Sequence, residues 1–257
     1  MKILCIGDVT SPSAAEYLAS VLEKFKREHA IDAAIVNAEN AGFVTGASRE
    51  TAELLLLRGA DCLTGGNHTL RNRSIYSFLD ECDRVLRPIN FGAGAPGVGY
   101  TVIDACGYRV LVISAMGTVH IDPVLDSPFG FIDRVLEREE GKYDFSVLDI
   151  HAEATGEKLA VAHAYDGKIN CIFGTHTHVP TADAQILPRG TGYITDVGMC
   201  GERGGILGMD AERVVERMRT RLPYPFKISE GAPGADGVIF TLDEGSGRVV
   251  GVERVTL

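Results

Sequence analysis

The chain alternates between short apolar runs and longer segments in which apolar residues recur at helical spacing. Across residues 13–29 the apolar positions lie 3, 4, 7 and 10 residues after Ala15, which places them on one face and predicts an amphipathic helix. A second helix is expected over 48–58, where Ser48 is a suitable N-cap and Gly59 a suitable end. Three further helices are expected over 74–82, 131–139 and 157–165.

The apolar runs between these helices predict buried strands, because they are short and bounded by turn residues. They cover residues 2–7, 33–38, 60–65, 145–150, 169–174 and the first part of 192–199. Residues 99–117 and 237–257 each contain two apolar runs around a glycine-containing turn, which predicts two hairpins. Strand–helix units fill the first third and hairpins follow, so the pattern predicts mixed α/β layers in a single domain over 1–257.

Composition and charge narrow the class of protein. The chain is 45% hydrophobic and 23% charged, as ordinary globular proteins are. Its net charge of −10 repels long polyanions, so no stable DNA binding is expected, although bound metal ions would still attract a small phosphorylated substrate. The start of the chain lacks a signal-peptide core, no apolar run approaches the roughly 20 residues of a membrane span, and the six cysteines form no C-x-x-C pair. We therefore expect a cytoplasmic protein with free thiols and no membrane partner.

Polar side chains follow five of the predicted strands directly. They are Asp8, the pair Glu39 and Asn40, the pair Asn67 and His68, His151, and the pair His176 and His178. Loops at the carboxyl ends of strands line the ligand crevice of an α/β sheet, so these clusters converge if their strands are neighbours. Each cluster alone is also compatible with a turn or a cap, and the His-x-His pair is the most specific of them.

These side chains carry the donor atoms of a metal centre. Histidine nitrogens and carboxylate oxygens suit zinc, iron or manganese. Two carboxylates, three histidines and side-chain amides exceed the needs of one catalytic ion, but they fit two ions that share a bridging carboxylate. The two carboxylates cancel only part of the charge of two divalent ions, so the site attracts an anionic phosphate. The ligand mix favours phosphoester hydrolysis over metal storage.

The motifs resemble those of the calcineurin-like metallophosphoesterase superfamily, and in particular its YmdB-like phosphodiesterases. The matching stretches are IGD (6–8), NAENA (37–41), GNHT (66–69), HAEAT (151–155), GTHTHV (174–179), ILPRGTGYITDVGM (186–199) and GILGMD (205–210). Three positions depart from the superfamily pattern: Thr10 replaces a histidine, Glu39 an aspartate, and Thr69 an acidic residue. The same departures are typical of the YmdB-like group.

The resemblance implies a fold and a site. The implied fold is a four-layer α/β/β/α sandwich with two mixed sheets. One ion would be held by Asp8, Glu39, Asn40 and His178 and the other by Glu39, Asn67, His151 and His176, with Glu39 bridging. His68 would be the general acid that protonates the leaving alkoxide after attack by metal-activated hydroxide. The family's ions are usually iron or manganese, and zinc also suits these donors.

The resemblance also implies an activity, the hydrolysis of small phosphodiesters, with 2′,3′-cyclic nucleotides as the substrate class. A rival hypothesis is a nucleotide-sensing regulatory protein that retains the metal site; His68 favours the enzyme, because a sensor needs no acid. A nicotinamide-dependent enzyme is excluded, since no G-x-G-x-x-G follows the first strand.

Further residues are expected near the site. Thr175 and Thr177 are expected to support neighbouring ligands, and Arg87 and His120 are candidates for substrate contact. A homo-oligomer is compatible with the sequence.

Overall fold

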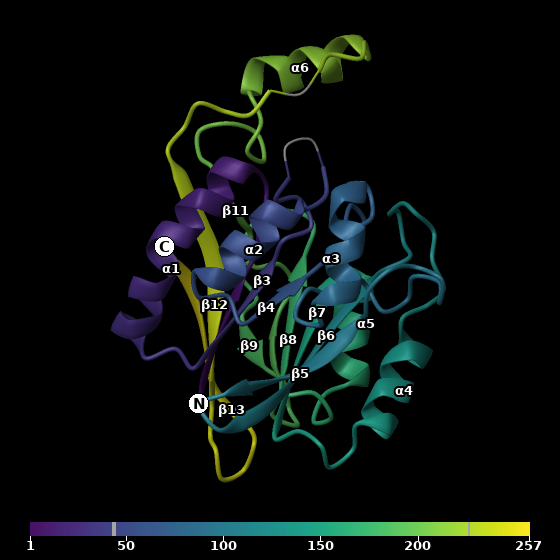
Figure 1. The fold of residues 1–257 in the computed structure, drawn as a ribbon, viewed down its shortest axis with the longest axis vertical. Helices are drawn as coiled ribbons and strands as arrows, with labels where there is room; N and C mark the ends of the chain where they lie inside the picture. Colours follow the sequence, from purple (N-terminus) through teal and green to yellow (C-terminus); the bar gives the residue numbers. More distant parts are fainter. Residues whose placement is uncertain (43–44, 226) are drawn as a thin grey trace.

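Two mixed β-sheets pack face to face between two layers of helices (Figure 1). This computed structural model describes residues 1–42, 45–225 and 227–257. The seven-stranded sheet has the order β2 (Asp8–Val9), β11 (Met199–Glu202), β12 (Pro233–Leu242), β1 (Lys2–Ile6), β3 (Ala33–Asn37) and β4 (Cys62–Thr64), with β13 (Val249–Thr256) paired to β12. The six-stranded sheet has the order β5 (Tyr100–Ala105), β6 (Tyr108–Met116), β7 (Phe145–His151), β8 (Cys171–Thr175), β10 (Gly192–Ile194) and β9 (Gln185–Ile186).

Helices cover the outer face of each sheet. The seven-stranded sheet packs against α1 (Pro12–His29), α2 (Arg49–Leu57) and α3 (Tyr76–Glu81), the last preceded by a 3₁₀ turn over Arg73–Ile75. The six-stranded sheet packs against α4 (Phe129–Arg138) and α5 (Thr155–Ala164). A third apolar core fills the space between the two sheets. The expected α/β/β/α sandwich is therefore confirmed.

Strands such as β1 and β3 are continuous apolar runs because both of their faces are buried. In β1, Ile3 and Cys5 face the core between the sheets, whereas Leu4 and Ile6 face the helices. Successive side chains of a strand point to opposite faces, so such a strand needs apolar residues at every position. Strands β1, β3 and β4 run parallel, as do β6, β7, β8 and β10, which places the carboxyl ends within each set at one edge.

The expected helices form within a few residues of their predicted bounds. Ser48 caps α2 by accepting a hydrogen bond from the Thr51 amide at 3.2 Å, and Gly59 follows the helix with a φ of 105°. The C-terminal hairpin differs from the expectation in one respect. Its first strand, β12, extends back to Pro233 and lies inside the sheet, between β1 and β11, because β1 pairs with it antiparallel.

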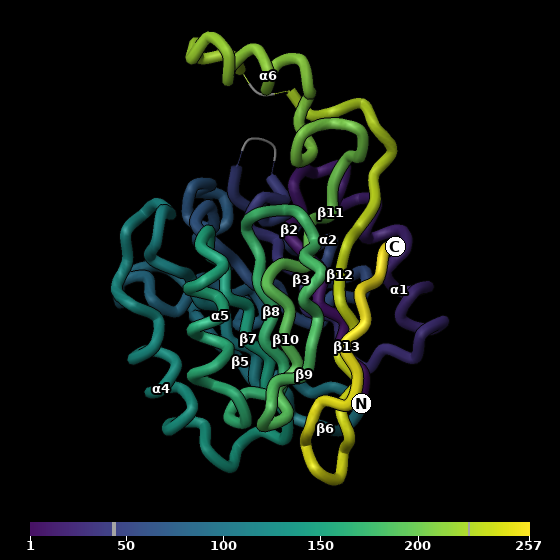
Figure 2. The backbone as a smooth tube through the Cα atoms, turned by 180° about the vertical axis from the view of Figure 1, so that it is seen from behind, coloured from purple at the N-terminus to yellow at the C-terminus, as the bar shows by residue number. Residues whose placement is uncertain are grey.

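Four elements were not predicted: the short strands β2, β9 and β11, and α6 (Ala211–Thr220). Helix α6 projects from the body on an arm formed by the residues between β11 and β12 (Figures 1 and 2). Only Val214 of this helix is buried, so it lacks the broad apolar face by which the other helices were recognised. Within the described parts of the chain, no helix is long and apolar enough to span a membrane.

Candidate metal centre

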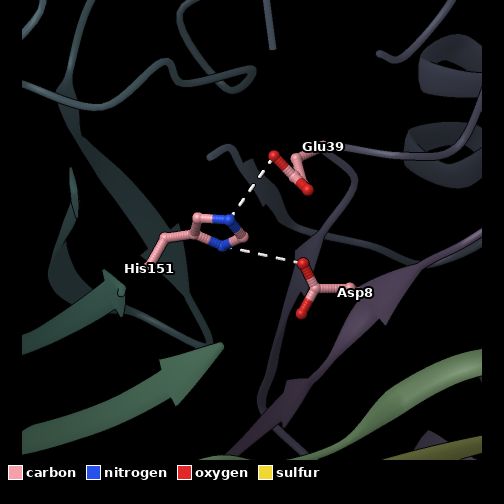
Figure 3. Close-up of side chains that lie close together, drawn as sticks. All are labelled: Asp8, Glu39 and His151. Atoms are coloured by element: carbon pink, nitrogen blue, oxygen red, sulfur yellow. Dashed lines mark ion pairs between the residues drawn. The ribbon is translucent and has the colours of Figure 1, made fainter. Parts of the chain in front are cut away.

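The five polar clusters meet at one edge of the sandwich. Asp8 lies in β2, directly after β1, and Glu39 and Asn67 follow β3 and β4. His151 ends β7, and His176 and His178 follow β8. Asp8, Glu39 and His151 are buried, and each places a side-chain atom within 4.8 Å of the others (Figure 3).

His151 is the centre of one half of the cluster. Its Nε2 lies 3.0 Å from Asn67 Oδ1, 3.1 Å from His176 Nδ1 and 3.5 Å from Glu39 Oε2. Burial lowers the pKa of His151 to about 3, so the ring is neutral and carries one proton. Whether that proton lies on Nδ1 or Nε2 decides whether Nε2 and the three atoms around it can bind a cation.

The hydroxyl of Thr175 fixes the tautomer of His151. It donates to Asp149 Oδ1 at 2.7 Å, so it must accept at 2.9 Å from Nδ1–H of His151. Burial raises the pKa of Asp149, and the value stays at about 7 because hydrogen bonds from Thr64, Thr175 and Asn37 favour the ionised form. Nε2 of His151 then carries a lone pair and faces two oxygens, Asn67 Oδ1 and Glu39 Oε2. A cation between these three atoms satisfies all of them. Thr175 therefore contacts His151 directly, and its support of a metal ligand stays a prediction.

Asp8 and His178 form the other half, which touches the first because Asp8 Oδ1 lies 3.6 Å from His151 Nδ1 (Figure 3). Asp8 Oδ2 accepts a hydrogen bond from the His176 amide at 3.0 Å, whereas Oδ1 lies 3.9 Å from His178 Nε2. Of the residues described, only Asp8 Oδ1, His178 Nδ1 and Arg87 Nε are buried side-chain atoms without a hydrogen-bond partner. Burial and the charge of Glu39 raise the pKa of Asp8 well above its usual range. An orphaned carboxylate oxygen beside a buried histidine ring fits a bound cation.

Glu39 lies between the two halves and also contacts His68. It accepts hydrogen bonds from the His68 amide at 2.7 Å and from the side-chain amide of Asn40, and its Oε1 lies 3.1 Å from His68 Nδ1. Burial alone would raise the pKa of Glu39, but the hydrogen bonds from the amide and ring of His68 lower it. Thr69 follows His68 where the superfamily has an acidic residue, and Glu39 supplies the carboxylate that contacts His68.

The two threonine departures have structural roles. Thr69 Oγ1 accepts from the Gly66 amide at 2.8 Å and donates to the Gly66 carbonyl at 2.9 Å, which closes the turn that carries Asn67 and His68. Thr10 donates to the Cys200 carbonyl at 3.1 Å and so joins β2 to β11.

Two sequence candidates remain outside the cluster. His120 is exposed, and Arg87 donates to the Pro88 carbonyl at 3.0 Å. Within the described chain, no hydrogen bond or ion pair joins either residue to the cluster.

Sequence reasoning missed several residues that hold the cluster. Asn37 links the sheets by donating to Asp149 Oδ2 at 2.8 Å, and both side chains are fully buried. Glu153 lies 3.2 Å from His176 Nε2 through its Oε2, on the ring edge opposite the one that faces His151. The available signal was a polar residue inside an apolar run, as with Asn37 in AAIVN and Asp149 in FSVLDIH.

Two sheets between helices, with histidines and carboxylates gathered at one edge, define the metallophosphoesterase-like class of fold and site. A family model described as YmdB-like protein matches residues 4–255, and the chain belongs to that family. It is 39% identical, over 100% of its length and 97% of the relative, to a 2′,3′-cyclic-nucleotide 2′-phosphodiesterase from Bacillus subtilis.

Two crystal structures are similar to the chain over its whole length. One is a phosphatase from Mycoplasma pneumoniae, with a TM-score of 0.92, 31% identity and 93% of that chain covered. The other is a hypothetical protein from Thermus thermophilus, with a TM-score of 0.88, 36% identity and 99% of that chain covered. The resemblance drawn from the sequence motifs is thereby confirmed.

Proposed function

We propose that the chain is a dinuclear-metal phosphodiesterase that hydrolyses small phosphodiesters of the 2′,3′-cyclic nucleotide class. The observation that carries this proposal is the convergence of histidine, carboxylate and amide donor atoms around Glu39, with His68 beside it. The name of the Bacillus subtilis relative supports the substrate class.

The two halves of the cluster divide the proposed ligands between two ions. One ion is assigned to Asp8, Glu39, Asn40 and His178, and the other to Glu39, Asn67, His151 and His176. Mixed nitrogen and oxygen donors suit iron or manganese, and also zinc. When bound, such ions supply an activated water and polarise the phosphoryl oxygens. The protein holds the donors: Thr175 fixes the tautomer of His151, and Glu153 occupies the other nitrogen of His176.

His68 is proposed as the general acid. Its side chain is 22% exposed, whereas Glu39 beside it is 1% exposed, so the ring lies where a substrate can reach it. Glu39 engages Nδ1 and leaves Nε2 to deliver a proton to the leaving alkoxide. The rival hypothesis, a nucleotide sensor, requires the ions but has no use for this proton.

Metal-dependent turnover tests the function. We expect the purified protein, loaded with Mn(II) or Fe(II), to hydrolyse 2′,3′-cyclic AMP and to lose that activity in a chelator. The measurement is nucleotide product by chromatography, with bound metal quantified in the same sample. A protein that binds both the ions and the nucleotide without turnover would support the sensor instead.

The two histidines of the 174–178 loop are expected to serve different ions. His176 contacts His151, whereas His178 approaches Asp8, so His176→Ala and His178→Ala each remove a ligand from one half. We expect each variant to bind about one ion fewer, measured by metal analysis and by Mn(II) electron paramagnetic resonance. His163→Ala, an exposed change on α5, is the control. Loss of both ions in both variants would contradict the division into two halves.

A further inference from the structure

The loop that carries His176 and His178 has a strained backbone. His176 has a φ of 103° and His178 a φ of 64°, and both values are disfavoured for residues with a Cβ atom. Such conformations persist only where the surroundings hold them, and they concentrate at functional sites. Thr177 separates the two histidines, so its contacts identify the residues that hold the loop in this conformation.

A single carboxylate oxygen holds Thr177. Asp196 Oδ2 accepts hydrogen bonds from the Thr177 amide at 3.0 Å and from its hydroxyl at 2.8 Å. The other oxygen, Oδ1, accepts from the Gly198 amide at 2.9 Å, so the carboxylate is itself fixed. Asp196 belongs to the short connection between β10 and β11, which links the two sheets.

A buried lysine completes the arrangement. Lys158 Nζ, from α5, lies 2.9 Å from the same Asp196 oxygen, and the side chains of Lys158 and Asp196 are 1% and 0% exposed. Within the described residues this is the only ion pair of Lys158. A buried ion pair contributes little net stability compared with apolar residues of the same shape, so its presence here suggests a role in conformational specificity.

We propose that Asp196 and Lys158 are positioning residues of the metal centre. They hold Thr177 so that His176 and His178 point into opposite halves of the cluster, and neither contacts the proposed ions or substrate. The inference rests on the proposed function, because it assigns these residues a task only if the two histidines bind ions.

The test removes both charges together, in the double variant Lys158→Met/Asp196→Asn. We expect Mn(II) affinity to fall about 10- to 100-fold, the size typical for residues that orient metal ligands, with a lower kcat at saturating metal. The measurements are Mn(II) titration, kcat and KM on 2′,3′-cyclic AMP, and thermal unfolding. Lys158→Arg, which keeps the charge, should recover much of the affinity.

A second lysine–aspartate pair, which is less buried, provides the control. Lys26 and Asp61 are 2.6 Å apart at the opposite edge of the seven-stranded sheet, where Asp61 also accepts from the Ala34 amide. Lys26→Met should lower the unfolding temperature and leave Mn(II) affinity and kcat unchanged. If the double variant, like Lys26→Met, loses stability but keeps its Mn(II) affinity and kcat, Asp196 and Lys158 are merely structural. That result would overturn the inference.

A milder variant covers the case in which the double variant does not fold. Thr177→Val removes the hydroxyl donor and keeps the amide donor, so we expect about a 5-fold loss of Mn(II) affinity. Unchanged affinity in Thr177→Val would overturn the inference. If the wild type itself bound no ions, the proposed function would fail first, so the two failures are distinguishable.

Discussion

Replacing His68 with alanine is expected to slow the hydrolysis of 2′,3′-cyclic AMP by about 10²- to 10⁴-fold, the usual contribution of a general acid. Both ions should remain bound, because the contact of residue 68 that most directly supports Glu39 is its backbone amide, at 2.7 Å, and alanine retains it. The measurements are kcat under saturating metal and the metal content of the same preparation. His29→Ala, an exposed change at the end of α1, is the control.

The dependence on the leaving group separates acid catalysis from a general loss of activity. The ribose alkoxide of a cyclic nucleotide needs a proton to leave, whereas p-nitrophenolate is stable without one. His68→Ala should therefore lose much less activity on bis-p-nitrophenyl phosphate than on 2′,3′-cyclic AMP. Equal losses on the two substrates would refute the assigned role of His68.

Replacing Gly66 with alanine is expected to remove at least one ion and to lower kcat by about 10³-fold, or about 4 kcal/mol of activation free energy. A Cβ at this position would lie 2.4 Å from His151 Nε2 and 2.5 Å from Glu39 Oε2, the two atoms that face one proposed ion. Their displacement would separate the donors on either side of that ion.

Gly156→Ala is the matched control, because a Cβ there meets nothing within 4 Å although the residue lies only five positions after His151. Metal content, kcat and thermal unfolding should be measured for both variants. Retention of two ions and full activity by Gly66→Ala would show that His151 and Glu39 do not face a common ion.

The layers and the position of the site could be predicted from sequence for a physical reason. Strands buried on both faces must be apolar throughout, so the polar residue that ends each run is conspicuous, as with Asp8 after KILCI. Parallel strands then bring such ends to one edge. The clusters at Glu39, Asn67, His151 and His176 follow the same rule, and the structure places them together.

The side chains that contact and hold the site residues could not be predicted, because these contacts join segments that are distant in the sequence. Glu39 and His68 are 29 positions apart, and their contact requires β3 and β4 to be neighbours. Lys158 lies in a helix pattern, where a lysine is ordinarily expected at the surface, yet it is buried against Asp196, 38 positions away. Helix α6 was missed because its pattern is mostly polar.

Because β12 lies inside the seven-stranded sheet, that sheet is completed only late in synthesis of the chain. Asp8 sits in β2, which pairs with β11, and β11 in turn pairs with β12. Strand β12 begins at Pro233, so it leaves the ribosome long after the segments that carry the histidines. Lys2 pairs with Thr241, so this contact closes nearly the whole chain into a loop. Contacts between residues so far apart in the sequence form slowly. Loading with metal is therefore expected to be among the last events of biogenesis.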